Sequence, residues 1–424
     1  MSDYRRRVVD DELDELMLGV AAIAIEGPRG VGKTETALRR AATSYRLDNA
    51  AVRAVIQADP ERVTAGARPI LIDEWQALPE TWDLVRRAVD DDRSPGQYLL
   101  TGSAGPRNPP THSGAARIIS LRMRSMTLAE RGAGVPTVSL TELLGGGRAP
   151  LTGSTDVTVE RYAYEILASG LPGLRDLPER AVRAQLDGYL EHIIDHDFEE
   201  LGTPVRNQAA LRRWMTAHAS ALSGTVSYEK IRDAATAGHD EKPAKTTVFR
   251  YLDTLERLWI IEPIPAWIPA RNDLARLALS PKHQLADPAL AARLRGATMD
   301  TLLEGTPAGP LAPRDATLLG ALFESQVAHD VRTYAQRAEA RVSHFRTRDG
   351  GHEVDLMVER ADQRVVAIEV KLARAVADEH VRHLLWLRER LGDDLLDAVV
   401  ITTGPEAYRR RDGIAVVPAA LLGA

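Results

Sequence analysis

The sequence predicts an α/β protein in three parts. They are a parallel-sheet domain with a phosphate-binding loop (a P-loop NTPase fold), a helical region with a winged-helix-like module, and a C-terminal α/β domain. Three observations predict this order: a glycine-rich turn directly after an apolar run near the N-terminus, helical periodicity in the middle, and alternating apolar and polar residues near the end. We place the parts at residues 1–148, 149–265 and 266–424, and a glycine-, serine- and threonine-rich stretch marks the first boundary.

Length and charge narrow the class of protein. At 424 residues the chain is too long for one ordinary core. The net charge of −6 gives no global case for nucleic-acid binding but leaves a local basic surface open. The absence of cysteine excludes disulfides and thiolate metal sites. The N-terminus lacks an apolar signal segment and no run is long enough to cross a bilayer, so we expect a cytoplasmic protein without a membrane partner.

The clearest motif is Gly27-x-x-x-x-Gly32-Lys33-Thr34, which lies between an apolar run and a helix-favouring stretch. Glycines let backbone N–H groups face a phosphate, and the helix that follows adds the positive end of its dipole. Lys33 is expected to reach the β- and γ-phosphates, and Thr34 to ligate Mg²⁺. A plain glycine turn is the alternative. The expected nucleotide-binding residues are Gly27, Pro28, Arg29, Gly30, Val31, Gly32, Lys33, Thr34 and Thr36.

A second apolar run, residues 70–72, ends in Asp73-Glu74, which is the Walker B arrangement. Ligands gather at the carboxyl ends of buried parallel strands. We expect Asp73 to hold Mg²⁺ and Glu74 to orient and polarise the water that attacks the γ-phosphate. A strand end without function is the alternative reading of these two carboxylates.

Two further strands end in polar residues that bear on the same chemistry. Residues 96–103 end in Thr101-Gly102-Ser103, and Ser103 or Thr101 is the candidate sensor of the γ-phosphate, although such a turn needs no function. The following strand carries arginines, one of which could stabilise charge in the transition state, although solvated arginines are the favoured reading for any one of them. These arginines are Arg117, Arg122 and Arg124.

The middle region offers two open questions. A long helix over 181–200 ends in clustered carboxylates and a histidine at 195–200, where a solvated helix end is favoured over a metal site. Residues 226–264 read as a helix, a turn, a second helix and a strand, which suggests a winged helix. The pattern is compatible both with a module that binds DNA and with a helical packing domain that binds none. Its local basic residues are Lys242, Lys245, Arg250 and Arg257.

The C-terminal region places carboxylates on a predicted hairpin. Asp355 lies on one strand and Glu369-x-Lys371 on the next, which is the spacing of PD-(D/E)xK nucleases. Period-2 geometry puts Glu369 and Lys371 on one face. Asp355, Glu369 and Glu324 from the preceding helix are the expected Mg²⁺ ligands, and Lys371 is expected to position water or to stabilise the scissile phosphate. The alternative is a vestigial nuclease fold kept for binding or assembly.

Taken together, the chain resembles the prokaryotic AAA-type ATPases that carry a C-terminal domain of uncharacterised function with a PD-(D/E)xK nuclease-like end. Besides the motifs above, the resemblance rests on Gly170–Gly173, Thr247–Leu252, Pro281–His283 with Asp287, and Phe323-Glu324. One departure is Ser125, where similar proteins usually have proline. The resemblance implies an ATPase joined to a restriction-endonuclease-like domain, without a settled substrate.

We therefore predict an enzyme that binds ATP and Mg²⁺ and hydrolyses ATP, with its nucleotide state coupled to the C-terminal module. Glu74, Lys33, Ser103 and Lys371 are the predicted catalytic residues. The alternative is an ATP-gated regulatory or binding module with little turnover. DNA and a second copy of the chain remain open as further partners.

Overall fold

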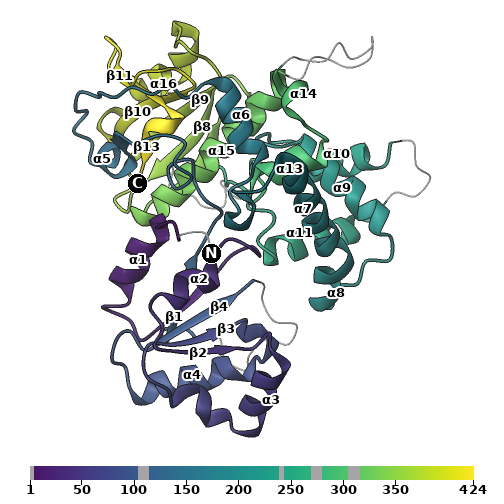
Figure 1. The fold of residues 1–424 in the computed structure, drawn as a ribbon. Coiled ribbons are helices and arrows are strands. Elements are labelled where there is room, and N and C mark those ends of the chain that lie inside the picture. The colour runs from purple at the N-terminus through teal and green to yellow at the C-terminus, as the bar shows by residue number, and fades with distance from the viewer. Residues whose placement is uncertain (1–3, 104–113, 238–242, 269–278, 304–315) are drawn as a thin grey trace.

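A computed structural model describes residues 4–103, 114–237, 243–268, 279–303 and 316–424. Figure 1 shows a parallel sheet at one end of the molecule, a second sheet at the other end, and a group of helices beside both. Among the helices in these ranges, none combines the length and apolar character that a bilayer crossing demands.

The first sheet is parallel throughout and has the strand order β2-β3-β4-β1-β5. Its strands are β1 (Ala22–Glu26), β2 (Thr43–Arg46), β3 (Ile70–Asp73), β4 (Tyr98–Gly102) and β5 (Ile118–Arg122). This confirms the predicted α/β fold of the N-terminal part. Because parallel strands end at one edge, the P-loop, the Asp73-Glu74 pair and the Thr101–Ser103 turn converge there.

Alternating side chains of this sheet enter two separate cores. Ile23 and Ile25 face the side covered by α1 (Val8–Leu16) and α2 (Lys33–Leu38), whereas Ala22 and Ala24 face the side covered by α3 (Ala50–Ala58) and α4 (Glu80–Asp91). The short helical turns η1 (Pro60–Thr64) and η2 (Trp75–Ala77) complete the second side. Burial on both faces explains why these strands read as continuous apolar runs.

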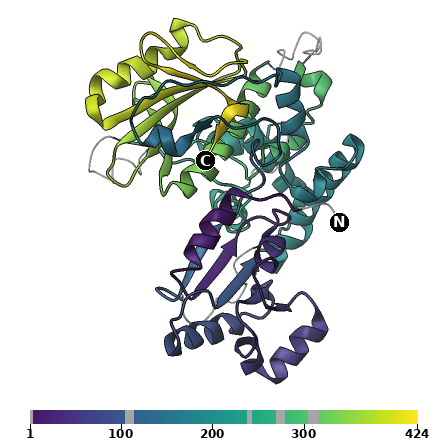
Figure 2. The same ribbon diagram turned by 60° about the vertical axis from the view of Figure 1, so that its left-hand side comes forward.

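The chain leaves the first sheet after β5 and runs to the opposite end of the molecule. There β6 (Val138–Ser139) pairs in parallel with β13 (Leu422–Gly423), and α5 (Leu140–Leu144) lies against the second sheet. Figure 2 shows this segment crossing from the lower to the upper part. Residues 123–144 therefore connect the two sheets directly.

The middle of the chain is helical, as predicted. Its helices are α6 (Val159–Leu167), α7 (Glu179–His192), α8 (Phe198–Glu200), α9 (Gln208–Ser220), α10 (Tyr228–Ala235), α11 (Lys245–Arg257), α13 (Pro288–Leu294) and α14 (Met299–Leu303), with the short turn η3 (Pro172–Leu174). The single helix predicted over 181–200 is interrupted by a π-helical turn, η4 (Ile193–Asp197). The predicted helix is therefore confirmed as a continuous helical segment, with a π turn that the sequence pattern did not indicate.

The strand predicted over 259–264 is also not a regular strand. Ile261 and Ile264 instead form isolated antiparallel bridges with Leu285 and Lys282. An apolar run becomes a strand only with a continuous partner, and here the partner segment gives two separate points of pairing. This pairing fixes the backbone of residues 282–285 beside the end of α11.

The second sheet has the order β11-β12-β10-β9-β8-β7. The helix α15 (Ala316–Arg337) precedes β7 (Arg341–Arg346), β8 (Glu353–Glu359) and β9 (Val365–Lys371), which are antiparallel neighbours as the hairpin prediction required. After α16 (Asp378–Leu391), β10 (Leu395–Thr402) runs parallel to β9. The sheet is completed by β12 (Ala415–Pro418) and β11 (Tyr408–Arg409), with the short turns η5 (Gly392–Asp394) and η6 (Ala419–Leu421) nearby.

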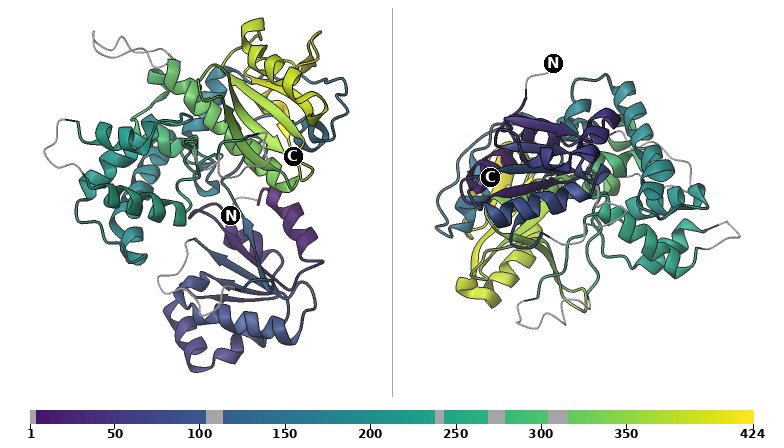
Figure 3. Two further views of the ribbon diagram at one scale, coloured as in Figure 1. Left: turned by 180° about the vertical axis from the view of Figure 1, so that it is seen from behind. Right: turned by 90° about the horizontal axis from the view of Figure 1, so that it is seen from below.

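Helices cover both faces of the second sheet. Val381 and Leu384 of α16 pack on one face, and Leu322 and Phe323 of α15 enter the core of the other. Seen from behind and from below, α15 lies between this sheet and the helical part (Figure 3). The long helix α15 therefore carries contacts to each part of the molecule, including α1 of the first domain.

Candidate functional site

The P-loop backbone has the conformation that its glycines permit. Gly30 and Gly32 have φ angles of +79° and +106°, in the left-handed region that side chains disfavour. A Cβ atom at Gly27 would lie 2.1 Å from the carbonyl oxygen of Met123, just after β5. The loop therefore turns tightly into α2 and passes close to the segment that follows β5.

Lys33 lies inside this turn. Its side chain is 5% exposed, and Nζ donates to the carbonyl oxygens of Gly27 and Pro28 at 2.8 Å each. Burial lowers the pKa of the Lys33 amine to about 8. The amine is thus held within the loop by groups that a phosphate can replace.

The predicted Mg²⁺ ligands of the first domain meet at the carboxyl edge of the sheet. Thr34 Oγ1 donates to Asp73 Oδ1 at 2.7 Å, and Thr101 Oγ1 donates to the same oxygen at 2.5 Å. Asp73 is 2% exposed, and Arg46 Nε lies 3.7 Å from its other oxygen. A hydroxyl and a carboxylate side by side are a donor set that suits Mg²⁺.

Glu74 lies next to these residues in a constrained backbone conformation, with φ of 53° and ψ of 49°. Its Oε1 accepts a hydrogen bond from Ser103 Oγ at 3.3 Å, and its Oε2 accepts one from Gln76 Nε2. The two candidate sensors are thus divided: Thr101 contacts Asp73 and Ser103 contacts Glu74. A left-handed conformation at a non-glycine residue is a common feature of functional sites.

Three other predicted loop residues have structural partners. The Val31 side chain is fully buried, and the Pro28 carbonyl accepts from Lys33. Thr36 is also buried, and its hydroxyl lies 2.8 Å from the hydroxyl of Tyr4, which donates to Asp10. The Thr36 hydroxyl of α2 therefore contacts Tyr4 of the N-terminal segment.

Sequence reasoning missed Arg7. This residue is 4% exposed and donates from Nη1 to the Val31 carbonyl at 2.8 Å and from Nη2 to the Arg124 carbonyl at 2.9 Å. Its Nε lies 3.1 Å from Glu130. Arg7 thereby fixes the P-loop to the segment after β5, and a lone arginine in a charged N-terminal stretch gave no signal of this.

The carboxylate cluster at the end of the long helix contacts the P-loop. Arg29 lies 3.2 Å from Asp197 and 2.7 Å from Glu200, and it hydrogen-bonds to His192. Tyr189 also donates to the Arg29 carbonyl at 3.3 Å. Asp197 is buried, so the favoured reading of a solvated helix end does not describe this residue. No group of three or more metal-ligating side chains suited to a metal ion occurs in the described part of the chain.

The three candidate arginines, Arg117, Arg122 and Arg124, lie on or beside β5. Arg122 approaches the P-loop, because its Nη1 would lie 3.5 Å from a Cβ atom at Gly27. Its guanidinium lies 3.9 Å from the ring centre of Trp259 and 3.7 Å from Glu262. None of its three side-chain nitrogens has a hydrogen-bond partner among the described residues, and burial lowers its pKa to about 10. Arg117 pairs with Asp90, and Arg124 donates to Glu262 and Gln336, so among the three only the Arg122 nitrogens have no hydrogen-bond partner in the described part of the chain.

A cavity of about 350 Å³ opens between the edge of the first sheet and the end of α11. The sheet side contributes residues that end β1 and β4, and the helix side contributes charged residues. The lining residues are Glu26, Trp75, Gly102, Asp253, Glu256, Arg257 and Trp259. The middle region therefore borders the predicted hydrolytic edge of the sheet.

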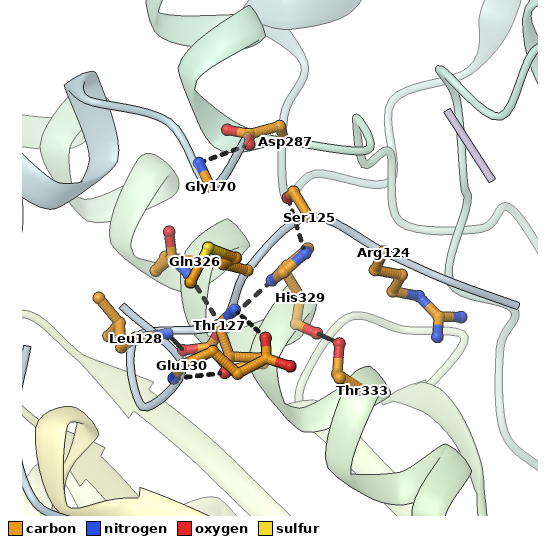
Figure 4. A network of polar contacts seen from close by, with 12 residues as sticks. Arg124, Ser125, Thr127, Leu128, Glu130, Gly170, Asp287, Gln326, His329 and Thr333 are labelled. Carbon is orange, nitrogen blue, oxygen red and sulfur yellow. Dashed lines mark hydrogen bonds and ion pairs between the residues drawn. The ribbon is translucent and has the colours of Figure 1, made fainter. Parts of the chain in front are cut away.

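The segment with the unusual Ser125 is well anchored. Ser125 Oγ lies 3.0 Å from His329 Nε2, the Thr127 amide donates to Glu130 at 2.7 Å, and the Leu128 amide donates to Asp330 at 3.3 Å (Figure 4). Both His329 and Asp330 belong to α15. Ser125 is therefore hydrogen-bonded to the helix that carries the C-terminal carboxylate Glu324.

The predicted C-terminal site residues also come together. Asp355 Oδ2 accepts from the Val370 amide at 2.9 Å, and Lys371 Nζ donates to Glu369 at 2.6 Å. Burial, followed by the charge of Asp355, raises the pKa of Glu369 to about 8 and that of Glu324 to about 7. Besides burial, the raised pKa values of Glu369 and Glu324 reflect the short distance of both carboxyl groups from the Asp355 carboxylate.

Lys282 occupies the middle of this group and was not predicted as a site residue. Its Nζ lies 2.8 Å from Glu324, 2.8 Å from Asp355 and 3.5 Å from Glu353. Burial alone would lower the pKa of Lys282, but the charges of Asp355 and Glu324 raise it above its ordinary value. The same lysine lowers the pKa of Asp355 against the effect of burial. In the sequence, Pro281-Lys282-His283 supports the family resemblance but indicates no role for the lysine.

The basic residues of the winged-helix-like region are divided. Lys245 pairs with Glu229, Arg250 is exposed, and Arg257 lines the cavity at the first sheet. Lys242 lies outside the described residues. The three described basic residues of this set therefore have different surroundings: an ion pair, solvent and the cavity lining.

Comparison with known proteins places the first domain. Residues 20–131 match the family model of an AAA domain. This range contains the P-loop, Asp73-Glu74 and Ser103 in the geometry described above. The N-terminal part is therefore similar to AAA domains in sequence, and it has the P-loop and parallel sheet described above. Two other matches are to domains of unknown function: residues 159–301 match DUF8612 and residues 319–422 match DUF4143.

Relatives and solved structures add little about activity. Uncharacterized proteins of Mycobacterium bovis and Mycobacterium tuberculosis are each 26% identical over 404 residues, covering 94% of this chain and 80% of theirs. A Walker-type ATPase of Pyrococcus abyssi is similar at a TM-score of 0.37 and 16% identity, over 68% of this chain and 94% of its own. A Thermotoga maritima RuvB mutant has a TM-score of 0.27 at 14% identity, over 61% and 88%.

Proposed function

We propose that this protein is a Mg²⁺-dependent ATPase whose nucleotide state controls the packing of its middle and C-terminal parts. The observation that carries the proposal is the meeting of Thr34 with Asp73, and of Glu74 with Ser103, at one edge of the sheet. Binding alone would need the P-loop but not a carboxylate aimed beside a hydroxyl sensor. Hydrolysis is therefore the better account of this edge.

Each residue has a stated role in the proposal. Lys33 exchanges its bonds to the Gly27 and Pro28 carbonyls for bonds to the β- and γ-phosphates. Thr34 and Asp73 would hold Mg²⁺, which would supply positive charge to the phosphates. Glu74 orients and polarises the attacking water.

Two contacts of the first domain provide a route by which nucleotide could act on the rest of the chain. Arg29, within the P-loop, is held by Asp197 at the end of η4 and by Glu200 at the end of α8. Arg122 stacks on Trp259 at the end of α11. Because a phosphate attracts both guanidinium groups, binding would compete with these contacts and change how the helices pack.

Phosphate release by the purified chain tests the ATPase. We expect Lys33→Ala to abolish turnover through loss of binding, and Glu74→Gln to reduce turnover by roughly 100-fold while ATP still binds. Glu35→Gln is the matched control, because Glu35 is an exposed carboxylate on the same helix. Turnover that survives Lys33→Ala unchanged would show that it does not arise from this site.

The second candidate function is DNA cleavage by the C-terminal part, with DNA held by the winged-helix-like region. What favours it is the order α15, three antiparallel strands, α16 and a parallel strand, together with the grouping of Asp355, Glu369 and Lys371. In this proposal Glu324 joins Asp355 and Glu369 as a Mg²⁺ ligand. Such binding requires Lys282 to leave the carboxylates, since a metal and the amine need the same oxygens.

Incubation of plasmid and single-stranded DNA with the full chain and Mg²⁺ or Mn²⁺ tests cleavage. The second candidate predicts nicking that is lost in Asp355→Ala and Lys371→Ala. Nicking that persists in Asp355→Ala would identify a contaminant. Absence of cleavage, together with retained ATP turnover, would favour a vestigial nuclease fold that serves binding or assembly.

A further inference from the structure

Lys282 is a buried cation whose backbone is fixed independently of its side chain. Its amide donates to the Ile264 carbonyl at 2.9 Å, and the Ile264 amide donates back to the Lys282 carbonyl at 2.9 Å. The neighbouring His283 is bridged to Leu222. The lysine side chain is 1% exposed and therefore enters the C-terminal site from a position that the middle region determines.

The amine is surrounded by carboxylates from two elements. Glu324 comes from α15, whereas Asp355 and Glu353 come from β8, and their oxygens lie at 2.8, 2.8 and 3.5 Å from Nζ. The opposite oxygen of Asp355 accepts the Val370 amide. One cation thus offsets part of the negative charge that these carboxylates bring together in a buried place.

This arrangement leaves no room for a metal ion at the same oxygens. Mg²⁺ needs oxygen ligands at about 2.1 Å in a near-octahedral shell. An ammonium group in hydrogen-bond contact with both Glu324 and Asp355 lies where such an ion would be. The second cation of the site, Lys371, is paired with Glu369. The carboxylates that were expected to ligate metal therefore already have positive partners from the chain itself.

We propose that Lys282 is the resident cation of the C-terminal site, holding Glu324 and Asp355 in place of a divalent metal. The protein as it folds does not bind Mg²⁺ or Mn²⁺ there, and the group acts as an electrostatic clamp that joins residues 280–287 to α15 and β8. The proposal is independent of ATP hydrolysis. It is incompatible with the metal-dependent cleavage of the second candidate function, and it makes the C-terminal part a binding or transmitting element instead.

Mn²⁺ titration of the full chain tests the clamp. All variants carry Asp73→Asn, so that the first domain contributes no site, and free Mn²⁺ is followed by electron paramagnetic resonance without nucleotide. We expect no Mn²⁺ bound up to about 1 mM with Lys282 present, and about one Mn²⁺ per chain in Lys282→Met, with a melting temperature that rises in Mn²⁺. Lys282→Arg keeps the charge and is expected to stay metal-free.

Two results would overturn the clamp. The first is one bound Mn²⁺ per chain with Lys282 in place that is lost in Asp355→Asn. The second result comes from melting temperatures, which still test the clamp if the Lys282→Met chain folds too poorly for the Mn²⁺ titration. Combining Lys282→Met with Asp355→Asn removes one charge of each sign, so the double variant is expected to melt higher than the single one, and equal or lower melting contradicts the proposal. Neither readout uses ATP, so a failure here is separate from a failure of the ATPase.

Discussion

Replacing Glu262 by glutamine should destabilise the junction between the first domain and the rest of the chain. One oxygen of Glu262 lies 2.6 Å from Arg124 and 3.1 Å from Arg332, and the other lies 3.7 Å from Arg122. The carboxylate is thus shared by Arg122 and Arg124, at and just after the end of β5, and by Arg332 of α15. Glutamine keeps the size of the side chain but removes the charge that these arginines face.

The size of the effect follows from burial. The Glu262 side chain is 18% exposed, and removing one partner of a buried ion pair costs about 3 to 5 kcal/mol because the opposite charge stays buried. Partial exposure favours the lower end, about 3 kcal/mol. At about 2.1 cal/mol/K per residue, the 424-residue chain has an unfolding entropy of about 0.9 kcal/mol/K, so that loss lowers the melting temperature by roughly 3 °C.

Differential scanning calorimetry measures this shift. Glu15→Gln is the matched control, because Glu15 is 65% exposed and pairs with Arg337 at 3.1 Å on the surface. We expect the control to lose less than about 0.5 kcal/mol. If the two glutamine variants melt at the same temperature, the cluster around Glu262 does not stabilise the junction and the reasoning from burial is wrong.

Three further predictions concern the P-loop, acid stability and turnover. Gly27→Ala should lower stability by about 3 kcal/mol or more and abolish ATP binding, because its Cβ meets backbone at 2.1 Å, whereas Gly147→Ala has open space and should be neutral in the same urea titration. Burial lowers the pKa of His218 to about 3, so the unfolded chain binds the extra proton between that value and about 6.5. The free energy of unfolding should therefore fall by about 2 kcal/mol between about pH 7.5 and about pH 5, and His218→Leu should remove that part of the fall in urea titrations. Arg122→Ala should lower the kcat of ATP hydrolysis by roughly 10- to 100-fold while Arg117→Ala leaves it within about twofold, and equal effects of the two would exclude a special role for Arg122.

The first sheet could be predicted because its signals are local. Gly27–Thr34 combines a strand, a turn and a helix start within a few residues, and each part has a physical requirement that few residue types meet. The hairpin of β8 and β9 was predictable for the same reason, since alternation and a short turn fix its register. Where a motif is contained in one short segment, the sequence determines both the fold and the meeting of side chains.

Contacts between distant segments could not be predicted in this way. Arg7 reaches the P-loop and Arg29 reaches Asp197, yet nothing in their neighbouring residues indicates the partner. Lys282 is the clearest case, because carboxylate spacing predicted a metal and the neutralising amine comes from a segment outside the hairpin. The irregular pairing at 261–264 was missed since strand formation depends on the partner as well as on the apolar run.

The pairing of β6 with β13 has a consequence for biosynthesis. Val138 pairs with Leu422, a separation of 284 residues (422 − 138). At about 5 to 20 residues per second, the ribosome needs roughly 15 to 60 s to supply the partner strand after β6 has been made. The AAA-type domain can fold during that interval, but the segment that leads out of it stays unpaired. The nascent chain therefore contains every strand of the first sheet well before β6 can pair with β13.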